Sequence, residues 1–296
     1  MLTLYFPQGD LKSQFYNDTS YVQGVSGRVA HFSQAYVELM FLFYRLFGWG
    51  IRQITGLMED CWKQRDIDLS VPSFGHLCDL FACLDITLKQ RCIKLAARLK
   101  RGENISLIVD STGMRTEGSG EWYQHKYNRT TRRKGWAKFH MAIDPEGNCL
   151  AVEMTSEEIG DSPILDQFLE RDLPVGKIIA DGAYYQIERN QTLIARGIIP
   201  VIPPKKEAVV HGIPGYETHD LTVQYIQDKG SVYAWQKKQG YGIRSRIEAQ
   251  FSRIKRCIGS CLLTKRTASR KNEGIAMANL INIWNSFGKC QTMKIA

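Results

Sequence analysis

The chain has 296 residues, 44% of them hydrophobic, which is enough to bury the core of one large domain or of two modest ones. Its net charge of +9 is concentrated after residue 100, because residues 1–100 hold eleven Lys and Arg against nine Asp and Glu. This uneven basic excess favours a polyanionic partner such as nucleic acid.

The cysteines and the apolar runs argue against three other classes of protein. None of the eight cysteines forms a Cys-x-x-Cys pair and no histidine stands at zinc-finger spacing from them, which argues against structural zinc. The first residues lack a basic start followed by an apolar run, so we expect no signal peptide and a cytoplasmic protein with reduced thiols. The most apolar run, residues 35–50, is interrupted by Glu38 and Arg45, which predicts a buried helix and no membrane span.

Residues 1–100 predict an extended arm of about 30 residues followed by a helical domain. Ser70 and Ser73 are candidate helix caps around Pro72. The helices could form a helix-turn-helix unit, but residues 72–84, at the recognition-helix position, contain no Lys or Arg. DNA-end binding and dimerisation are therefore both open for this domain. Apolar side chains recur at helical spacing on three faces: Tyr36, Leu39, Met40, Phe43 and Leu46; Ile51, Ile54, Met58 and Trp62; Phe74, Leu77, Phe81 and Leu84.

From residue 101 the hydrophobic period changes to that of strands. Residues 105–110 form an apolar strand that Ser111, Thr112 and Gly113 end, and strands at 138–144 and 149–155 predict an antiparallel hairpin. A helix at 161–169, a strand at 177–181, a helix at 186–196 and a strand at 197–203 follow. This order predicts an α/β domain in which a mixed sheet is flanked by helices.

Three carboxylates stand out within this pattern. Asp110 and Asp181 each end an apolar strand, where ligands collect in α/β sheets, although a strand-end aspartate alone is often only a turn former. Glu248 is the only Asp or Glu between Asp228 and Glu273, an interval that holds twelve Lys and Arg. Together the three match the oxygen ligands that hard divalent cations require.

Glu248 lies in a segment that predicts an amphipathic helix. In a helix, Tyr241, Arg244, Glu248 and Lys255 fall within roughly 60° of one another. An alternative is a plain surface helix in which Glu248 only pairs with Arg244. Arg246 and Arg253 lie on an outward basic face, and the strip that docks on the core consists of Ile243, Ile247, Phe251, Ile254 and Ile258.

At these residues the chain resembles bacterial insertion-sequence transposases with a DDE catalytic domain, of the IS-four and IS-five superfamily and closest to the IS-five type. The resemblance covers about residues 105–288 and implies a ribonuclease-H-like fold. The pattern Tyr-x-x-Arg-x-x-x-Glu-x-x-x-x-x-x-Lys is met without gaps from Tyr241 to Lys255. The other shared words are Asp110-Ser-Thr-Gly-Met, Gly118-Ser-Gly-Glu-Trp, Trp136-Ala-Lys-Phe-His, Asp181-Gly-Ala-Tyr and Ile202-Pro-Pro-Lys.

The resemblance implies an enzyme that cuts DNA at the ends of an insertion sequence and joins the freed 3′-hydroxyls to target DNA. Asp110, Asp181 and Glu248 would hold two Mg²⁺ ions, with Mn²⁺ as a substitute, for hydrolysis and then transesterification. The implied partners are double-stranded DNA, as terminal inverted repeats and target, and a second copy of the chain in the DNA complex. Two rival functions remain open, a DDE-type nuclease without strand transfer and a transposase-derived DNA-binding protein.

The expected DNA contacts extend along the basic segments of this domain. Trp235, in an insertion at residues 203–240, is expected to receive an unstacked base, the alternative being that it anchors a small β-hairpin to the core. We expect His140 to be a packing residue or a residue that supports the ligands from behind, and not a ligand itself. The domains are expected at 1–100 and 101–288, with a tail at 289–296. The candidate DNA contacts besides Trp235 are Tyr241, Arg244, Lys255, Arg246, Arg253, Arg129, Arg132, Arg133, Lys134 and Lys138.

Overall fold

The computed structural model describes residues 10–16, 32–116 and 135–287. The chain divides into two compact units, of which unit 1 is Met1–Thr87 with Leu263–Ala276 and unit 2 is Leu88–Leu262 with Met277–Ala296. The domain boundaries at residues 100 and 288 and the insertion at 203–240 stay a prediction. Among the described residues, no helix is both long enough and apolar enough to cross a membrane.

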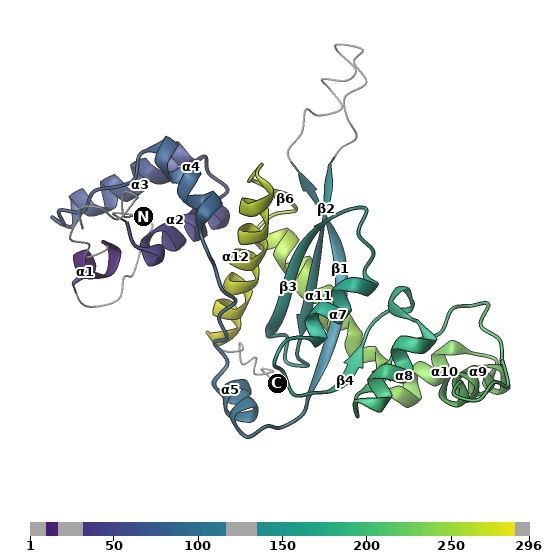
Figure 1. The fold of residues 1–296 in the computed structure, drawn as a ribbon. Helices are drawn as coiled ribbons and strands as arrows, with labels where there is room; N and C mark the ends of the chain where they lie inside the picture. Colours follow the sequence, from purple (N-terminus) through teal and green to yellow (C-terminus); the bar gives the residue numbers. More distant parts are fainter. Residues whose placement is uncertain (1–9, 17–31, 117–134, 288–296) are drawn as a thin grey trace, which may run out of the picture. The chain divides into compact units, whose positions relative to one another are not determined.

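Unit 1 is helical, as its apolar periodicity predicts (Figure 1). Its helices are α1 (Leu11–Phe15), α2 (Gln34–Phe47), α3 (Ile51–Gln64), α4 (Phe74–Cys83) and the first half of α12 (Thr267–Ser286). The side chains of Ser33 and Ser73 cap α2 and α4, accepting hydrogen bonds from Tyr36 N and His76 N. Ser70 caps no helix and instead shares a hydrogen bond with the Tyr16 hydroxyl.

The core of unit 1 corrects two expectations. Part of the expected extended arm is helix α1, because Asp10 caps its first turn and Phe15 stacks on Tyr36 at 4.7 Å between ring centroids. The buried face of α2 is also rotated from the expected one, since α2 is apolar on nearly every side and periodicity selects no unique stripe. Its buried apolar residues are Tyr36, Val37, Met40, Phe41 and Tyr44, whereas Leu39, Phe43 and Leu46 are partly exposed.

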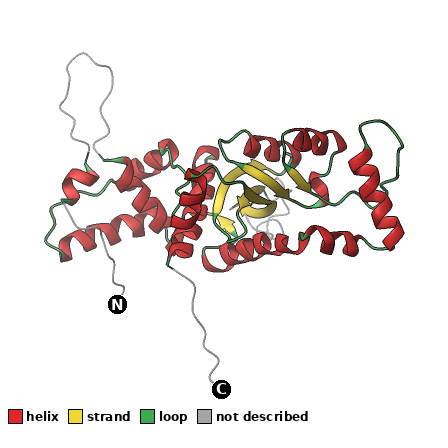
Figure 2. Ribbon diagram, turned by 90° about the horizontal axis from the view of Figure 1, so that it is seen from below, coloured by secondary structure: helices red, strands yellow, loops and turns green. Residues whose placement is uncertain are grey.

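Unit 2 is built on a six-stranded mixed sheet, with the order β3-β2-β1-β4-β5 and β6 paired to β1 (Figures 1 and 2). The hairpin of β2 and β3 is antiparallel and pairs with β1, whereas β4, β5 and β6 run parallel to their neighbours. This is the predicted mixed α/β arrangement, with the topology of a ribonuclease-H-like fold. The strands are β1 (Ile105–Thr116), β2 (Trp136–Ile143), β3 (Cys149–Ser156), β4 (Val175–Ile179), β5 (Ile199–Val201) and β6 (Cys261–Leu262).

Helices cover both faces of this sheet (Figure 2). On one face, α5 (Ile93–Lys100), α7 (Ser162–Leu169) and α8 (Ile187–Ala195) bury Leu95, Phe168 and Leu193 against Leu107 and Val109 of β1. On the other face, α11 (Ser245–Cys257) buries Ile247, Phe251 and Ile254 of the predicted apolar strip, and the Phe251 ring meets Phe139 of β2 edge to face at 6.1 Å. Ile258 of the strip is also buried just after the helix, but Ile243 lies before the helix and is only partly buried. Side chains alternate between faces along β1, so Asp110 points to the side of α11.

The segment at 203–240 contains helices where a β-hairpin was the alternative. It forms α9 (Glu217–Lys229) and α10 (Val232–Gln239), and a 3₁₀ turn, η2 (Tyr241–Arg244), leads from them directly into α11. Gly230 and Gly240 end α9 and α10 in the left-handed conformation, with φ values of 62° and 68°. The structure therefore places no strand between residues 203 and 240.

Candidate active site

Asp110 lies inside a strand and not at its end. The apolar run stops at Val109, but β1 continues to Thr116 because β2 supplies antiparallel partners, with Asp110 opposite Met141 and Ser111 opposite His140. On the other edge, β4 is paired only as far as Ile108. Asp110 therefore sits just beyond the point where the parallel neighbour ends, which is the ligand-binding position that strand-end residues occupy.

Asp181 follows β4 by two residues and reaches the same place. Its Oδ1 accepts a hydrogen bond from Ala183 N at 2.9 Å and so caps the 3₁₀ turn η1 (Gly182–Tyr184). Gly182 lies close to Pro203, where a Cβ atom would approach the Pro203 carbonyl oxygen to 3.3 Å. The cap therefore holds one carboxylate oxygen, while the second, Oδ2, faces the start of α11.

Arg244 joins the three carboxylates that the sequence singles out. Its Nη2 donates to Asp110 Oδ2 at 2.7 Å and lies 3.9 Å from Asp181 Oδ2, and its Nη1 donates to Glu248 Oε1 one helical turn away. The three acids come from β1, from the turn after β4 and from α11. The structure thus brings together the predicted triad, and the predicted Arg244–Glu248 pair is part of the cluster.

Burial and charge act in opposite directions on these groups. Burial raises the pKa of Asp110, with Asp181 and Glu248 adding to the rise, while Arg244 and the backbone N–H of Ser111 oppose it. Burial lowers the pKa of Arg244, but Asp110, Tyr241 and Glu248 outweigh this and leave it raised. One guanidinium therefore partly neutralises three carboxylates, and the cluster retains excess negative charge.

A second polar cluster supports Asp110 from the opposite face of the sheet. Asp161 Oδ1 accepts from Ser111 Oγ at 3.0 Å and from Lys138 Nζ at 3.4 Å, and it lies 3.5 Å from His140 Nδ1. His140 is fully buried, as expected, and its Nε2 lies 2.8 Å from Thr155 Oγ1. Asp161 precedes α7, where the sequence suggests a helix cap, but its side chain makes no capping hydrogen bond. Its contact with Ser111 is therefore not apparent from the sequence.

Asp110 and Glu248 open onto a cleft with cations along one side. Lys255 and Arg256, both about two turns beyond Glu248 on α11, line it together with Ser252 and Ser260. Lys255 Nζ donates to Thr112 Oγ1 at 2.6 Å, and Arg256 is exposed. The phosphates of a nucleic-acid backbone in this cleft would lie beside Asp110 and Glu248 and close to both cations of α11.

The other expected DNA contacts are dispersed. Arg246 bonds to the Pro145 carbonyl, Arg253 bonds to Asn285 at 2.7 Å, and Tyr241 is half-buried near Trp235 with ring centroids 6.5 Å apart. Lys138 is bound to Asp161 on the face away from α11. The candidates Arg129, Arg132, Arg133 and Lys134 lie outside the described residues.

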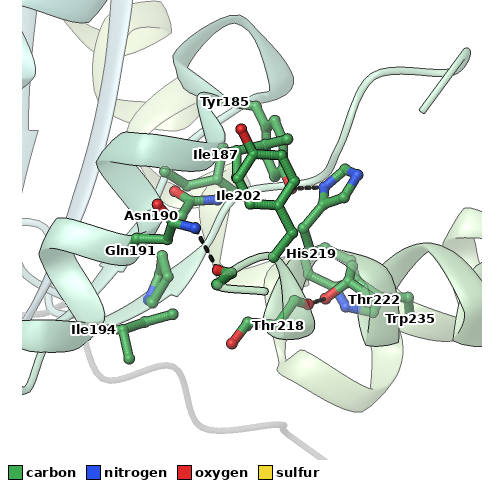
Figure 3. Close-up of a pocket in the computed structure, with 13 residues that line it drawn as sticks. Tyr185, Ile187, Asn190, Gln191, Ile194, Ile202, Thr218, His219, Thr222 and Trp235 are labelled. Atoms are coloured by element: carbon green, nitrogen blue, oxygen red, sulfur yellow. Dashed lines mark hydrogen bonds between the residues drawn. The ribbon is translucent and has the colours of Figure 1, made fainter. Parts of the chain in front are cut away.

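Trp235 is not on a loop but on α10, and its side chain is only 4% exposed. It lines a small pocket between α8 and α9, where the Tyr185 hydroxyl donates to His219 Nδ1 (Figure 3). His219 Nε2 in turn donates to the Val209 carbonyl at 3.1 Å. Base stacking on Trp235 would require its ring to leave this packing, and the contact stays a prediction.

No metal-binding cluster is preformed in the part of the chain that the structure describes. No group of three or more His, Cys, Asp or Glu side chains is arranged to hold an ion there. The donor chemistry nevertheless fits a hard divalent cation, because three carboxylates from separate elements converge on one cationic group. The guanidinium of Arg244 stands where such a cation would be shared.

The fold is ribonuclease-H-like, and within it Asp110, Asp181 and Glu248 converge on the Arg244 guanidinium. Comparison with protein families agrees: a family model described as Transposase DDE domain matches residues 102–283, and a second model with the same description matches residues 2–119. The chain belongs to the DDE transposases of insertion sequences. No solved structure matches it significantly. The assignment to the IS-five type stays a prediction.

Proposed function

We propose that this transposase cuts DNA at the ends of an insertion sequence and joins the freed 3′-hydroxyl ends to target DNA. The observation that carries the proposal is the convergence of Asp110, Asp181 and Glu248 within a domain that matches the DDE family. Asp110 and Glu248 line one cleft with Lys255 and Arg256, and Asp181 reaches the same cluster through Arg244, 3.9 Å away. A protein that only binds DNA gains nothing from three acids placed where phosphates must lie.

In this proposal Asp110, Asp181 and Glu248 hold two Mg²⁺ ions, for which Mn²⁺ can substitute. The ions would neutralise charge on the scissile phosphate and promote attack by water first and by the 3′-hydroxyl second. Asp110 is the most constrained of the three ligands, since its side chain is only 12% exposed against 36% for Asp181 and 57% for Glu248. It would therefore fix the position of the ions, while Glu248 has the freedom to adjust.

The remaining side chains of the cleft would hold the DNA. Lys255, fixed to Thr112 at 2.6 Å, and Arg256 would each neutralise a backbone phosphate next to the acids. Arg244, Tyr241, Arg246 and Arg253 would contribute after rearranging from their present partners. Two copies of the chain would hold the paired element ends in the bacterial cytoplasm.

A strand-transfer assay with a pre-cleaved element end tests this proposal. With Mg²⁺ or Mn²⁺, the purified protein should join the labelled 3′-hydroxyl end to a target plasmid, and an end carrying a 3′-deoxy nucleotide should not be joined. Cleavage of uncut ends without any joining would show a nuclease instead. Binding of ends without cleavage or joining would show a DNA-binding protein.

A further inference from the structure

Arg244 occupies the centre of the acid cluster. Its two terminal nitrogens contact Asp110 and Glu248 directly and Asp181 at 3.9 Å, and its side chain is 19% exposed. Its Nε is buried and has no hydrogen-bond partner among the described residues. The guanidinium is therefore held by the acids alone, through two of its three nitrogens.

These contacts use the oxygen atoms that a metal ion needs. Arg244 Nη2 donates to Asp110 Oδ2 at 2.7 Å. On Asp181 the other carboxylate oxygen, Oδ1, already accepts a hydrogen bond from Ala183 N. A divalent cation bound by all three acids would need the position that the guanidinium occupies. The two exclude each other, because they would overlap and because both are positively charged. This accounts for a triad that converges and yet presents no preformed metal cluster among the described residues.

We propose that Arg244 is an exchangeable counter-ion, which holds the three carboxylates together in the DNA-free protein and must leave them before metal ions bind. The inference rests on the proposed function, in which these acids are the metal ligands. A DNA phosphate is the alternative partner for the guanidinium, because it accepts the same two-pronged hydrogen bonding as a carboxylate. DNA binding and metal binding are then positively coupled through Arg244.

The local chain favours such an exchange. Arg244 ends the 3₁₀ turn η2, between Gly240 and Gly242 on one side and α11 on the other. A Cβ atom at Gly240 or Gly242 would meet no atom within 4 Å, so the chain faces open space at these two positions of the turn. Lys255 and Arg256 attract phosphates to the adjoining cleft. Once Arg244 turns towards a phosphate, three uncompensated carboxylates remain, and their mutual repulsion favours cation binding.

If Arg244 had only a structural role, its mutation would have the opposite effect on metal binding from the one that the exchange predicts. If the guanidinium only organised the acids, its removal would let them separate and would weaken metal binding. If it competes with the metal, its removal strengthens metal binding. The sign of the change therefore separates the two roles.

The test is Mn²⁺ binding to the DNA-free full chain, measured from the electron paramagnetic resonance signal of free Mn²⁺. We expect Arg244→Gln to bind Mn²⁺ about tenfold more tightly than the wild type or better, within the usual range of coupling between two ligands. Arg244→Lys, which keeps the charge but cannot span three acids, should fall between them. Lys237→Gln is the matched control, since it removes an exposed cation of α10 that does not line the cleft, and it should change the affinity by less than about threefold.

A second measurement adds a short duplex with the element's end sequence. Wild-type affinity for Mn²⁺ should rise more on DNA binding than that of Arg244→Gln, because only the wild type has a counter-ion to release. Equal or weaker Mn²⁺ binding by Arg244→Gln, with binding lost in Asp110→Asn, would overturn the exchange and leave the metal site intact. No Mn²⁺ binding by any variant, with or without DNA, would instead overturn the proposed function.

Discussion

The buried ion pair between Arg45 and Glu273 gives a prediction whose size follows from the structure. Arg45 Nε lies 3.0 Å from Glu273 Oε1, and the two side chains are 2% and 0% exposed. The carboxylate also accepts from Leu263 N, from Thr264 N and from Thr264 Oγ1, at 2.8, 3.0 and 2.6 Å. It therefore joins α2 to the start of α12 within unit 1 and satisfies three further donors.

Glu273→Gln removes the charge and replaces one acceptor oxygen by a donor group. Breaking a buried pair on one side typically costs about 3–5 kcal/mol, because the remaining buried charge loses the carboxylate that paired with it. We expect a loss of that order in the free energy of unfolding of unit 1. Urea titration followed by tryptophan fluorescence measures it, and hydrogen exchange of α2 peptides assigns it to this unit.

The exposed pair between Arg266 and Asp79 is the matched control. Its side chains are 60% and 69% exposed, so Asp79→Asn should change stability by less than about 1 kcal/mol. The double variant Arg45→Met, Glu273→Gln should recover part of the loss, since neither charge of the pair then remains and an amide oxygen is still there to accept from Leu263 or Thr264. A Glu273→Gln protein within about 1 kcal/mol of the wild type would refute the reasoning.

Two further predictions concern the cleft and the buried histidine. Lys255→Ala should weaken DNA binding and lower the slope of log K against log salt by about one unit, whereas Lys229→Ala on α9 should leave the slope unchanged. Burial lowers the pKa of His140 to about 4. Between about pH 6.5 and 4 the imidazole is therefore protonated in the unfolded chain but neutral in the folded one. Stability should fall across that window as pH decreases, by on the order of 3 kcal/mol, and His140→Phe should reduce this fall. An identical pH dependence in both proteins would contradict the assignment.

The sequence predicts the topology of unit 2 because its elements differ clearly in hydrophobic period. The order of the first five strands and the hairpin of β2 and β3 are confirmed, as is the burial of Ile247, Phe251, Ile254 and Ile258. Ile243 of the expected strip is only partly buried, and helices α9 and α10 were not predicted. The extension of β1 beyond Asp110 could not be predicted, because pairing with β2 sustains a strand there after the apolar run has stopped. The buried face of α2 was missed for a related reason, since a helix apolar on nearly all sides is oriented by its neighbours.

The acids of the candidate site could be predicted from the sequence, but the contacts that they make in the DNA-free protein could not. An isolated acid in a basic helix and two acids next to strands identify Asp110, Asp181 and Glu248. Spacing also pairs Arg244 with Glu248, but nothing local indicates that the same guanidinium reaches Asp110, 134 residues away. The contact between Asp161 and Ser111 likewise joins residues 50 positions apart. Such contacts are fixed by the fold and leave no periodic signal in the sequence.

Cleavage of an element end by single-acid variants tests the central claim most directly. Asp110→Asn, Asp181→Asn and Glu248→Gln should each abolish Mg²⁺-dependent cleavage of a labelled duplex, while end binding stays equal or becomes tighter because a negative charge beside the phosphates is lost. Asp228→Asn, an acid on α9 that bonds only to Gln224 in the described structure, should cleave normally. Undiminished cleavage by any of the three triad variants, in protein that still binds the end, would contradict the account.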